Sequence, residues 1–294
     1  MAVLTPQSLL RSLPLRRLPE AAPTTPRGAL LRRWGPAAGE CVAAVVAGLG
    51  FAYWSGSILD DPIRRAGQVS GLAALQLRLA VVALPLLAAV AVTTVWGSAR
   101  LRRLVLRLAC AAVAGLATGF LAGGQVFALR GTPWPINAEN GDNGALILFA
   151  REVMATGSTH SFYPPGVPYV LAYAADHFTQ GDPALALKPL LIVLLALTGP
   201  AAYLAWRLCL RPLPALAAAL VSALPQTMPY KSYSPLVLVV LVPLAAKLLM
   251  WLRASPTYSA RGAVLRGAFL GLVLGVLFLV YSGWHVWAAP GLAA

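Results

Sequence analysis

The chain has 294 residues, of which 59% are hydrophobic and 11% are charged. Soluble domains carry about 25% charged residues, so this composition excludes an ordinary water-soluble protein and indicates a chain built for lipid. The net charge of +14 comes from Lys and Arg in short clusters between apolar runs, which favours topology signals and contacts with membrane lipids over nucleic acid as a partner.

The N-terminal segment, residues 1–38, holds six Arg and no apolar run long enough for the core of a signal peptide. We expect a disordered basic tail that stays in the cytoplasm. The remainder, residues 39–294, is expected to form one transmembrane domain.

Apolar runs then follow one another to the end of the chain. A crossing needs roughly 20 mostly apolar residues. Runs that meet or approach this length predict an all-α polytopic bundle with about seven spans, over residues 41–59, 79–96, 104–129, 190–208, 213–224, 236–252 and 265–281. A weaker stretch, 167–178, contains Asp176 and His177 and is too short to cross unaided.

Charge decides how the weaker stretch is placed, because cytoplasmic loops collect Lys and Arg. If 167–178 does not span, most Lys and Arg fall on the cytoplasmic side; if it spans, they divide almost evenly. We therefore predict a re-entrant or interfacial helix over 167–178. Residues 130–188 then form one long extracytoplasmic loop, in a multi-pass protein of the cell membrane.

A second short helix is expected within this loop, over residues 144–154. Leu146, Phe149, Ala150 and Val153 recur at helical spacing on one face, with Arg151 directed away from it. This pattern is typical of a juxtamembrane helix that lies on the bilayer surface.

The strongest candidate for chemistry is Asp142, which follows Glu139 in the sequence 139–144 and directly precedes this helix. A carboxylate at the mouth of a membrane cavity can accept the proton of an attacking sugar hydroxyl. An Asp before an apolar helical run is also a common N-cap. Both interpretations stay open for Asp142.

Further candidates flank this position. The motif Phe162-Tyr163-Pro164-Pro165-Gly166 begins the 167–178 helix, and helix N-termini favour anions. Arg151, Lys188 and Lys231 each could pair with a lipid phosphate in the loop region, or be interfacial side chains that reach toward water.

In their order these features resemble the GT-C glycosyltransferases, and specifically the actinobacterial galactan 5-O-arabinofuranosyltransferases, although Asp142 and Tyr163 lie closer together in sequence than is usual in that family. The resemblance runs from about Cys41 to the end of the chain. It rests on three spans before an acidic outer loop, then residues 162–166, Lys188-Pro189, the segment 229–235 before a span, and 271–281 in the last span. Family members are about twice as long, which favours a truncated front portion of such an enzyme.

The resemblance implies transfer of arabinofuranose from a polyprenyl-phosphate donor to a lipid-linked galactan acceptor, with inversion. Asp142 would act as general base, and Glu139, Arg151, Tyr163, Lys188 and Lys231 would bind substrate. We expect no metal or other cofactor, because the three cysteines lack metal-ligand spacing.

Three alternatives remain open at this point. A mannosyltransferase that uses polyprenyl-phospho-mannose would need the same general features. A transporter is suggested by the Gly199-Pro200 interruption of the 190–208 run, although ionisable residues are scarce within the spans. A membrane scaffold without activity would agree with the short chain.

Overall fold

Apolar helices make up most of the protein. The computed structural model describes residues 27–159 and 163–286, with only the backbone described for residues 27–34. Within these residues six helices contain segments long and apolar enough to cross a membrane: α2 (Arg27–Ser55, through its Gly35–Ser55 part), α3 (Arg65–Trp96), α4 (Ala99–Ala128), α7 (Pro183–Trp206), α9 (Tyr233–Arg253) and α10 (Ala260–Val280). The predicted all-α polytopic bundle is confirmed. α2 begins inside the range 1–38 that was assigned to the basic tail, and residues 1–26 lie outside the described residues.

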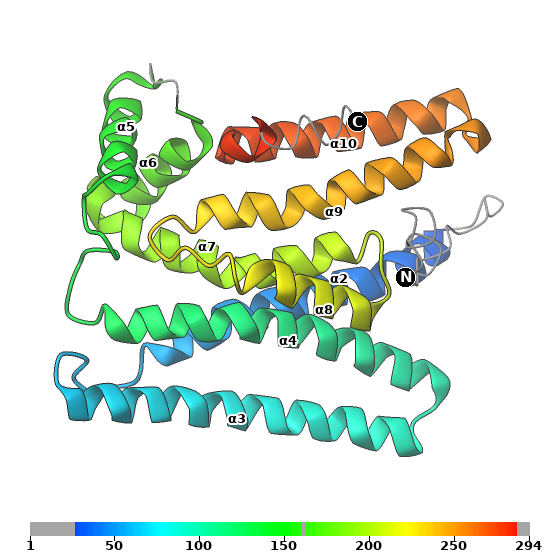
Figure 1. Ribbon diagram of the computed structural model, residues 1–294, viewed down its shortest axis with the longest axis horizontal. Coiled ribbons are helices and arrows are strands. Elements are labelled where there is room, and N and C mark those ends of the chain that lie inside the picture. The colour runs from blue at the N-terminus through cyan, green and yellow to red at the C-terminus, as the bar shows by residue number, and fades with distance from the viewer. Residues whose placement is uncertain (1–26, 160–162, 287–294) are drawn as a thin grey trace, which may run out of the picture.

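The long helices lie side by side (Figure 1). Consecutive long helices run in opposite directions, except that α7 and α9 both run from the same end of the bundle, because the chain turns back between them. One end of the bundle, here called the loop end, holds residues 56–64, 129–159 and 163–182, and the end of the connection 224–232. The opposite end, the tail end, holds the start of α2, residues 97–98 and 207–211, and the connection that contains the short helix η1 (Ser255–Thr257).

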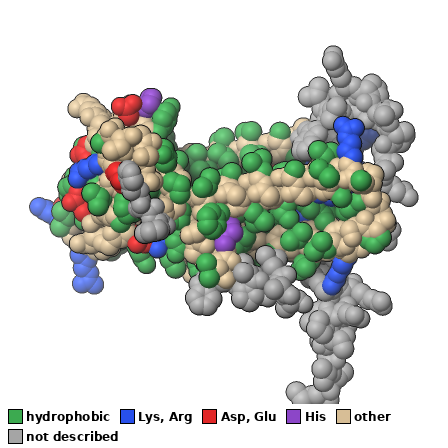
Figure 2. Space-filling model, turned by 90° about the horizontal axis from the view of Figure 1, so that it is seen from above, with side chains coloured by type: hydrophobic (Ala, Val, Ile, Leu, Met, Phe, Trp, Pro, Cys, Tyr) green, Lys and Arg blue, Asp and Glu red, His purple; other side chains and the backbone are tan. Residues whose placement is uncertain are grey.

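Acidic side chains gather at the loop end, where Figure 2 shows them beside the charged residues of the loops. Seven of the nine acidic residues in the sequence belong to the loop-end segments: Asp60, Asp61, Glu139, Asp142, Glu152, Asp176 and Asp182. The charged side chains visible at the tail end in Figure 2 are Lys and Arg. The two ends therefore differ in charge, as expected for a protein oriented by its cationic residues.

α8 (Pro212–Ala223) is shorter than the span predicted over 213–224. It has 12 residues, whereas a crossing needs roughly 20. Pro212 lies in the first turn of α8. An N–H in the first turn has no partner within the helix, so proline, which has no N–H, is favourable there. Pro225 follows the C-cap residue, where proline is common because it cannot continue a helix. The chain then returns to the loop end through the non-helical segment 224–232 (Figure 1). The described chain thus has six long helices and one half-length helix in place of seven full spans.

Glycines allow α2, α4 and α7 to approach backbone to backbone. A Cβ on Gly115 would lie 2.1 Å from the carbonyl oxygen of Ala44, and one on Gly199 would lie 2.2 Å from that of Ala114. A side chain at either glycine would push the helices apart. Small residues at helix crossings are typical of membrane bundles, where close backbones gain van der Waals contact.

Pro200 lies within α7 without ending it. Proline has no N–H, so the carbonyl of Ala196 one turn earlier loses its usual helical partner. Thr118 of α4 supplies a substitute, because its hydroxyl donates to the Ala196 oxygen at 2.9 Å and accepts the N–H of Gly199 at 3.0 Å. The interruption that suggested a transporter is therefore packed against α4 and satisfied there.

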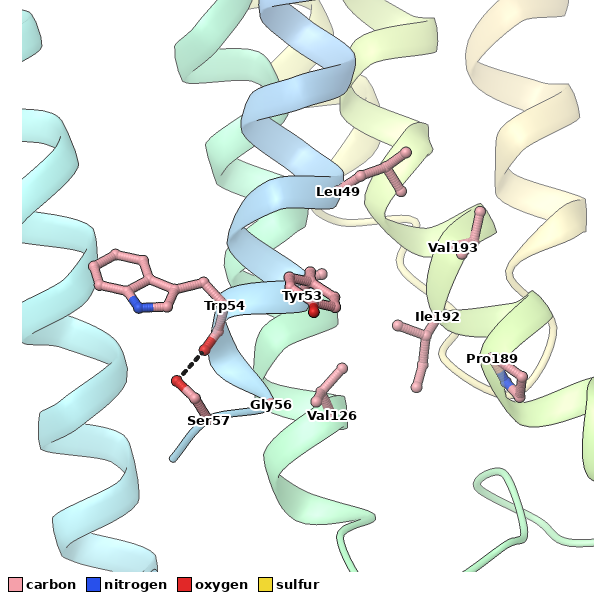
Figure 3. A pocket seen from close by; sticks show the side chains of 10 residues that line it. Leu49, Tyr53, Trp54, Gly56, Ser57, Val126, Pro189, Ile192 and Val193 are labelled. Atoms are coloured by element: carbon pink, nitrogen blue, oxygen red, sulfur yellow. Dashed lines mark hydrogen bonds between the residues drawn. The ribbon is translucent and has the colours of Figure 1, made fainter. Parts of the chain in front are cut away.

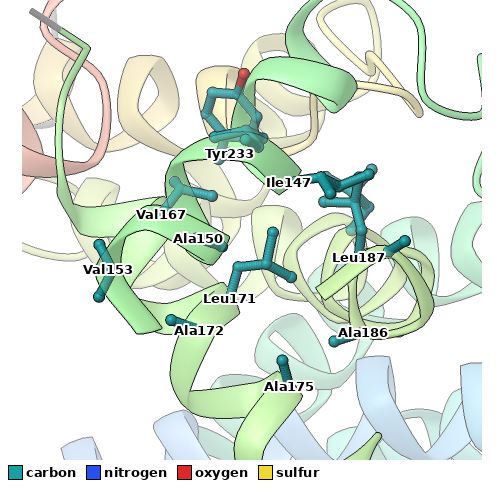
Figure 4. Packing of buried hydrophobic residues seen from close by; sticks show 13 residues of the cluster. Ile147, Ala150, Val153, Val167, Leu171, Ala172, Ala175, Ala186, Leu187 and Tyr233 are labelled. Carbon is teal, nitrogen blue, oxygen red and sulfur yellow. The ribbon is translucent and has the colours of Figure 1, made fainter. Parts of the chain in front are cut away.

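Two short helices, α5 (Asp142–Thr156) and α6 (Gly166–Phe178), occupy the loop end beside the start of α7 (Figure 1). Leu146 and Ala150 of α5 are fully buried against Leu171 of α6, Leu187 of α7 and Tyr233 of α9 (Figure 4). Three of the four residues predicted on the apolar face of α5, Leu146, Ala150 and Val153, are buried, whereas Phe149 is only partly buried. Ile147, which was not assigned to that face, is also buried. α6 has 13 residues and stays at the loop end, as expected for a helix too short to cross.

Candidate functional site

The loop before α5 is held in one conformation by a buried amide. Asn143 is 1% exposed, and its Nδ2 donates to the carbonyl oxygens of Ile136 and Ala138, each at 3.0 Å. Gly141 adopts a φ of 57°, which glycine tolerates well. A Cβ on Gly144 would lie 2.2 Å from the Glu139 carbonyl oxygen. These contacts fix the start of α5 and so the position of the Asp142 carboxylate.

Asp142 is the first residue of α5, and the residue before it, Gly141, is the N-cap. The helix has no side-chain capping hydrogen bond. Instead the Asp142 carboxylate forms an ion pair with the Lys231 ammonium, which comes from the connection between α8 and α9. The two side chains are 36% and 18% exposed, respectively. A ligand approaching from the loop end can therefore reach the Asp142 carboxylate.

Aromatic side chains surround this ion pair. The Lys231 Nζ lies 4.9 Å from the ring centroid of Tyr281 and 5.9 Å from that of Tyr233. The hydroxyls of Tyr163 and Tyr233 are 2.6 Å apart. We call Asp142, Tyr163, Lys231, Tyr233 and Tyr281 the Asp142–Lys231 cluster. It joins the start of α5, the turn before α6, the start of α9 and the residue after α10.

The cluster raises the pKa of both Lys231 and Tyr163. Burial lowers the pKa of Lys231, but the hydrogen bond to Asp142 and the nearby Tyr163 and Tyr281 outweigh it, so the pKa lies above its ordinary value of 10.5. Burial raises the pKa of Tyr163 above its ordinary value of 10.0, and the hydrogen bond with Tyr233 offsets only part of this. The site thus offers a proton acceptor, a fixed cation and phenolic donors.

Three of the six predicted site residues meet in this cluster: Asp142, Tyr163 and Lys231. Phe162, which belongs to the same motif as Tyr163, lies outside the described residues. The motif's Gly166 is needed for packing, because a Cβ there would lie 2.7 Å from the Leu279 carbonyl oxygen at the end of α10.

The other three predicted residues lie elsewhere at the loop end. Glu139 has an exposed side chain on the loop. Arg151 is exposed on α5, with its Nη2 3.8 Å from the carboxylate of Asp182. Lys188 donates from Nζ to the carbonyl oxygens of Leu129 at 2.8 Å and Thr132 at 2.5 Å, and so covers the C-terminal end of α4.

Sequence reasoning did not single out Tyr233 or Tyr281. Both stand at the ends of apolar runs, where aromatic residues usually mark the membrane interface. Trp284, which follows α10, also has a defined contact, because its Nε1 donates to the Oγ of Ser234 at 2.9 Å. This bond fastens the chain after α10 to the start of α9.

An apolar groove of about 820 Å³ also opens at the loop-end half of the bundle. Figure 3 shows Tyr53 and Trp54 on α2, Val126 on α4 and Ile192 on α7 around it. A smaller cavity of about 220 Å³ shares Pro189 and Val193 with the groove and continues along α7 toward α6. Both cavities are lined mainly by apolar side chains and lie beside α7.

Among the residues that the structure describes, no group of three or more His, Cys, Asp or Glu side chains could hold a metal ion. Comparison of the chain with protein-family models, with curated proteins and with solved structures finds no match. The functional assignment therefore depends on the site itself and on the motif resemblance.

Proposed function

We propose that this protein is a membrane glycosyltransferase that moves a sugar, arabinofuranose by its resemblance, from a polyprenyl-phosphate donor to a lipid-linked galactan acceptor. The observation that carries the proposal is the meeting of Asp142, Tyr163 and Lys231 at the loop end. They come from three separate segments, each of which the resemblance marks independently.

In the proposed reaction an acceptor hydroxyl oxygen attacks the anomeric carbon of the donor sugar. The bond from that carbon to the phosphate oxygen breaks, and polyprenyl phosphate leaves with the bonding electrons. The hydroxyl proton passes to the Asp142 carboxylate, which acts as general base. Attack on the face opposite the phosphate inverts the configuration of the sugar.

Lys231 has two roles in this scheme. Without substrate its ammonium pairs with Asp142. When the donor binds, its phosphate competes for the ammonium, which offsets the negative charge that develops on the leaving group. This exchange also frees the Asp142 carboxylate to receive the proton. Tyr163, neutral at pH 7, is positioned to donate a hydrogen bond to the sugar or the phosphate.

The apolar groove is a suitable place for the prenyl chain of the donor. Its lining is mostly hydrophobic, and it lies in the half of the bundle that also carries the Asp142–Lys231 cluster. Pro189 of the groove is next to Lys188, whose ammonium lies at the end of α4. Glu139 and Arg151, both exposed nearby, are candidate contacts for the acceptor.

The test is sugar transfer by membranes that contain Asp142→Asn. With radiolabelled polyprenyl-phospho-arabinofuranose and a galactan acceptor, we expect transfer to fall about 10²–10⁴-fold, the range that general-base catalysis contributes. Asp176→Asn is the matched control, because Asp176 is an exposed acidic residue of α6 at the same end. Unchanged transfer by the Asp142 variant would exclude Asp142 as the base.

The same membranes separate the alternatives. Preferential transfer from polyprenyl-phospho-mannose would identify a mannosyltransferase.

One observation favours transport, namely Lys247, which is buried within α9 with its Nζ 2.8 Å from the Leu208 carbonyl oxygen. Accumulation of labelled sugar inside sealed vesicles without covalent transfer would identify a transporter. If neither transfer nor uptake occurs with the full coding sequence, the scaffold alternative is favoured.

A further inference from the structure

A third cavity lies at the tail end, away from the Asp142–Lys231 cluster. Its volume is about 710 Å³, and five guanidinium groups from α4 and the α7–α8 connection line it: Arg100, Arg103, Arg107, Arg207 and Arg211. Such a concentration of like charge in one cavity is unfavourable unless an anion compensates it.

A single carboxylate inside the protein compensates part of this charge. Glu40 of α2 is 2% exposed, with Oε1 2.5 Å from Nε of Arg107 and 3.3 Å from Nη2 of Arg207. No other acidic residue of the described chain belongs to the tail end. Glu40 thus forms ion pairs with Arg107 and Arg207. The positive charges of the other, exposed arginines have no acidic partner in the described part of the chain.

The three remaining arginines can reach a ligand. Arg100, Arg103 and Arg211 are exposed, and none of them forms an ion pair with the described acidic residues. Guanidinium groups bind phosphate oxygens with two parallel hydrogen bonds, which favours phosphate over a simple halide. The cavity therefore suits a phosphate-bearing ligand.

Apolar side chains beside the cavity indicate the source of that phosphate. Leu104 of α4 lines the cavity and is 41% exposed. Leu101 and Leu213, which are adjacent in sequence to the lining residues Arg100 and Pro212, are 46% and 55% exposed. A ligand with a phosphate headgroup and acyl chains would contact both the arginines and these leucines. Basic pockets between membrane helices commonly bind headgroups of anionic lipids.

We propose that this tail-end cavity is a binding site for an anionic phospholipid, with Arg100, Arg103 and Arg211 holding the phosphate and Glu40 keeping Arg107 and Arg207 in place beneath it. The site is separate from the proposed transfer reaction and does not depend on it.

The test measures binding of fluorescent phosphatidylglycerol and phosphatidylcholine to the full chain in neutral detergent. The triple variant Arg100→Gln, Arg103→Gln and Arg211→Gln should bind phosphatidylglycerol at least 10-fold more weakly than wild type. The matched control, Arg102→Gln, Arg253→Gln and Arg261→Gln, removes the same charge from exposed residues that do not line the cavity. It should change affinity less than twofold.

Three outcomes would overturn the proposal. Equal losses in the pocket and control variants would mean that binding reflects overall charge. Equal affinity of the wild type for both lipids would mean that the anionic headgroup is not recognised. Pyrophosphate that binds tightly and displaces the lipid, with its binding lost in the pocket variant, would assign the cavity to a soluble phosphate. Matching thermal unfolding of the two triple variants shows that both are folded.

Discussion

The two ends of the bundle each contain a carboxylate that meets basic side chains, but the two arrangements differ in burial and in charge balance. At the loop end Asp142 pairs with one lysine, and both side chains remain partly exposed. At the tail end Glu40 is buried between two arginines, beside three more in the same cavity. An exposed carboxylate can meet a substrate, whereas a buried one mainly holds its neighbours in place.

The difference in burial predicts that the two ion pairs contribute unequally to stability. A buried charge without its partner is costly, because water cannot solvate it. A partly exposed pair contributes little to stability, because water screens each charge. The carboxylate at the loop end can therefore change its partner at a small cost in stability, whereas the carboxylate at the tail end cannot.

The largest expected effect on stability is that of Glu40→Gln. The substitution leaves the Arg107 and Arg207 guanidiniums, which are 26% and 10% exposed, without a carboxylate. Breaking a buried pair costs about 3–5 kcal/mol, and because both arginines line a cavity we expect the lower end of this range. The free energy of unfolding, measured by titration with a denaturing detergent in bicelles, should fall by that amount.

The matching change at the loop end is Asp142→Asn, which should lower the unfolding free energy by no more than about 1 kcal/mol, the range of exposed ion pairs. Equal losses for the two variants would remove the distinction between the ends.

A smaller effect is expected within the Asp142–Lys231 cluster. Tyr163→Phe deprives the fully buried Tyr233 of the hydroxyl that lies 2.6 Å from its own. A buried polar group that loses its partner costs about 1–3 kcal/mol, whereas removal of both groups is nearly neutral. The double variant Tyr163→Phe, Tyr233→Phe should therefore recover most of the loss in the same unfolding titration. Additive losses would show that the two hydroxyls are not coupled.

Much of the fold could be predicted because lipid imposes simple requirements on a sequence. Length and apolarity located the long helices, and the distribution of Arg and Lys assigned α6 to the loop end. The half-length α8 was predicted as a full span because a short apolar run before a proline has the same composition as a span. The contact of Thr118 with Ala196 has no sequence signal, because it depends on how closely two helices approach.

The site could be predicted only in part for a similar reason. Asp142 and Lys231 each had a local signal, but their pairing depends on where two distant loops meet. Lys188 has the sequence signature of a phosphate ligand or an interfacial lysine. Its contacts with the Leu129 and Thr132 carbonyls depend on the path of the chain after α4.

We propose that the Asp142–Lys231 cluster faces the extracytoplasmic side, opposite the basic tail end. This orientation is tested most directly by labelling single cysteines in intact cells with a membrane-impermeant maleimide, in a Cys41→Ala background because Cys41 is exposed. We expect Asn140→Cys, next to the cluster, to be labelled in intact cells and Arg102→Cys, at the tail end, only after permeabilisation. Labelling of Arg102→Cys in intact cells, with protection of Asn140→Cys, would contradict the account.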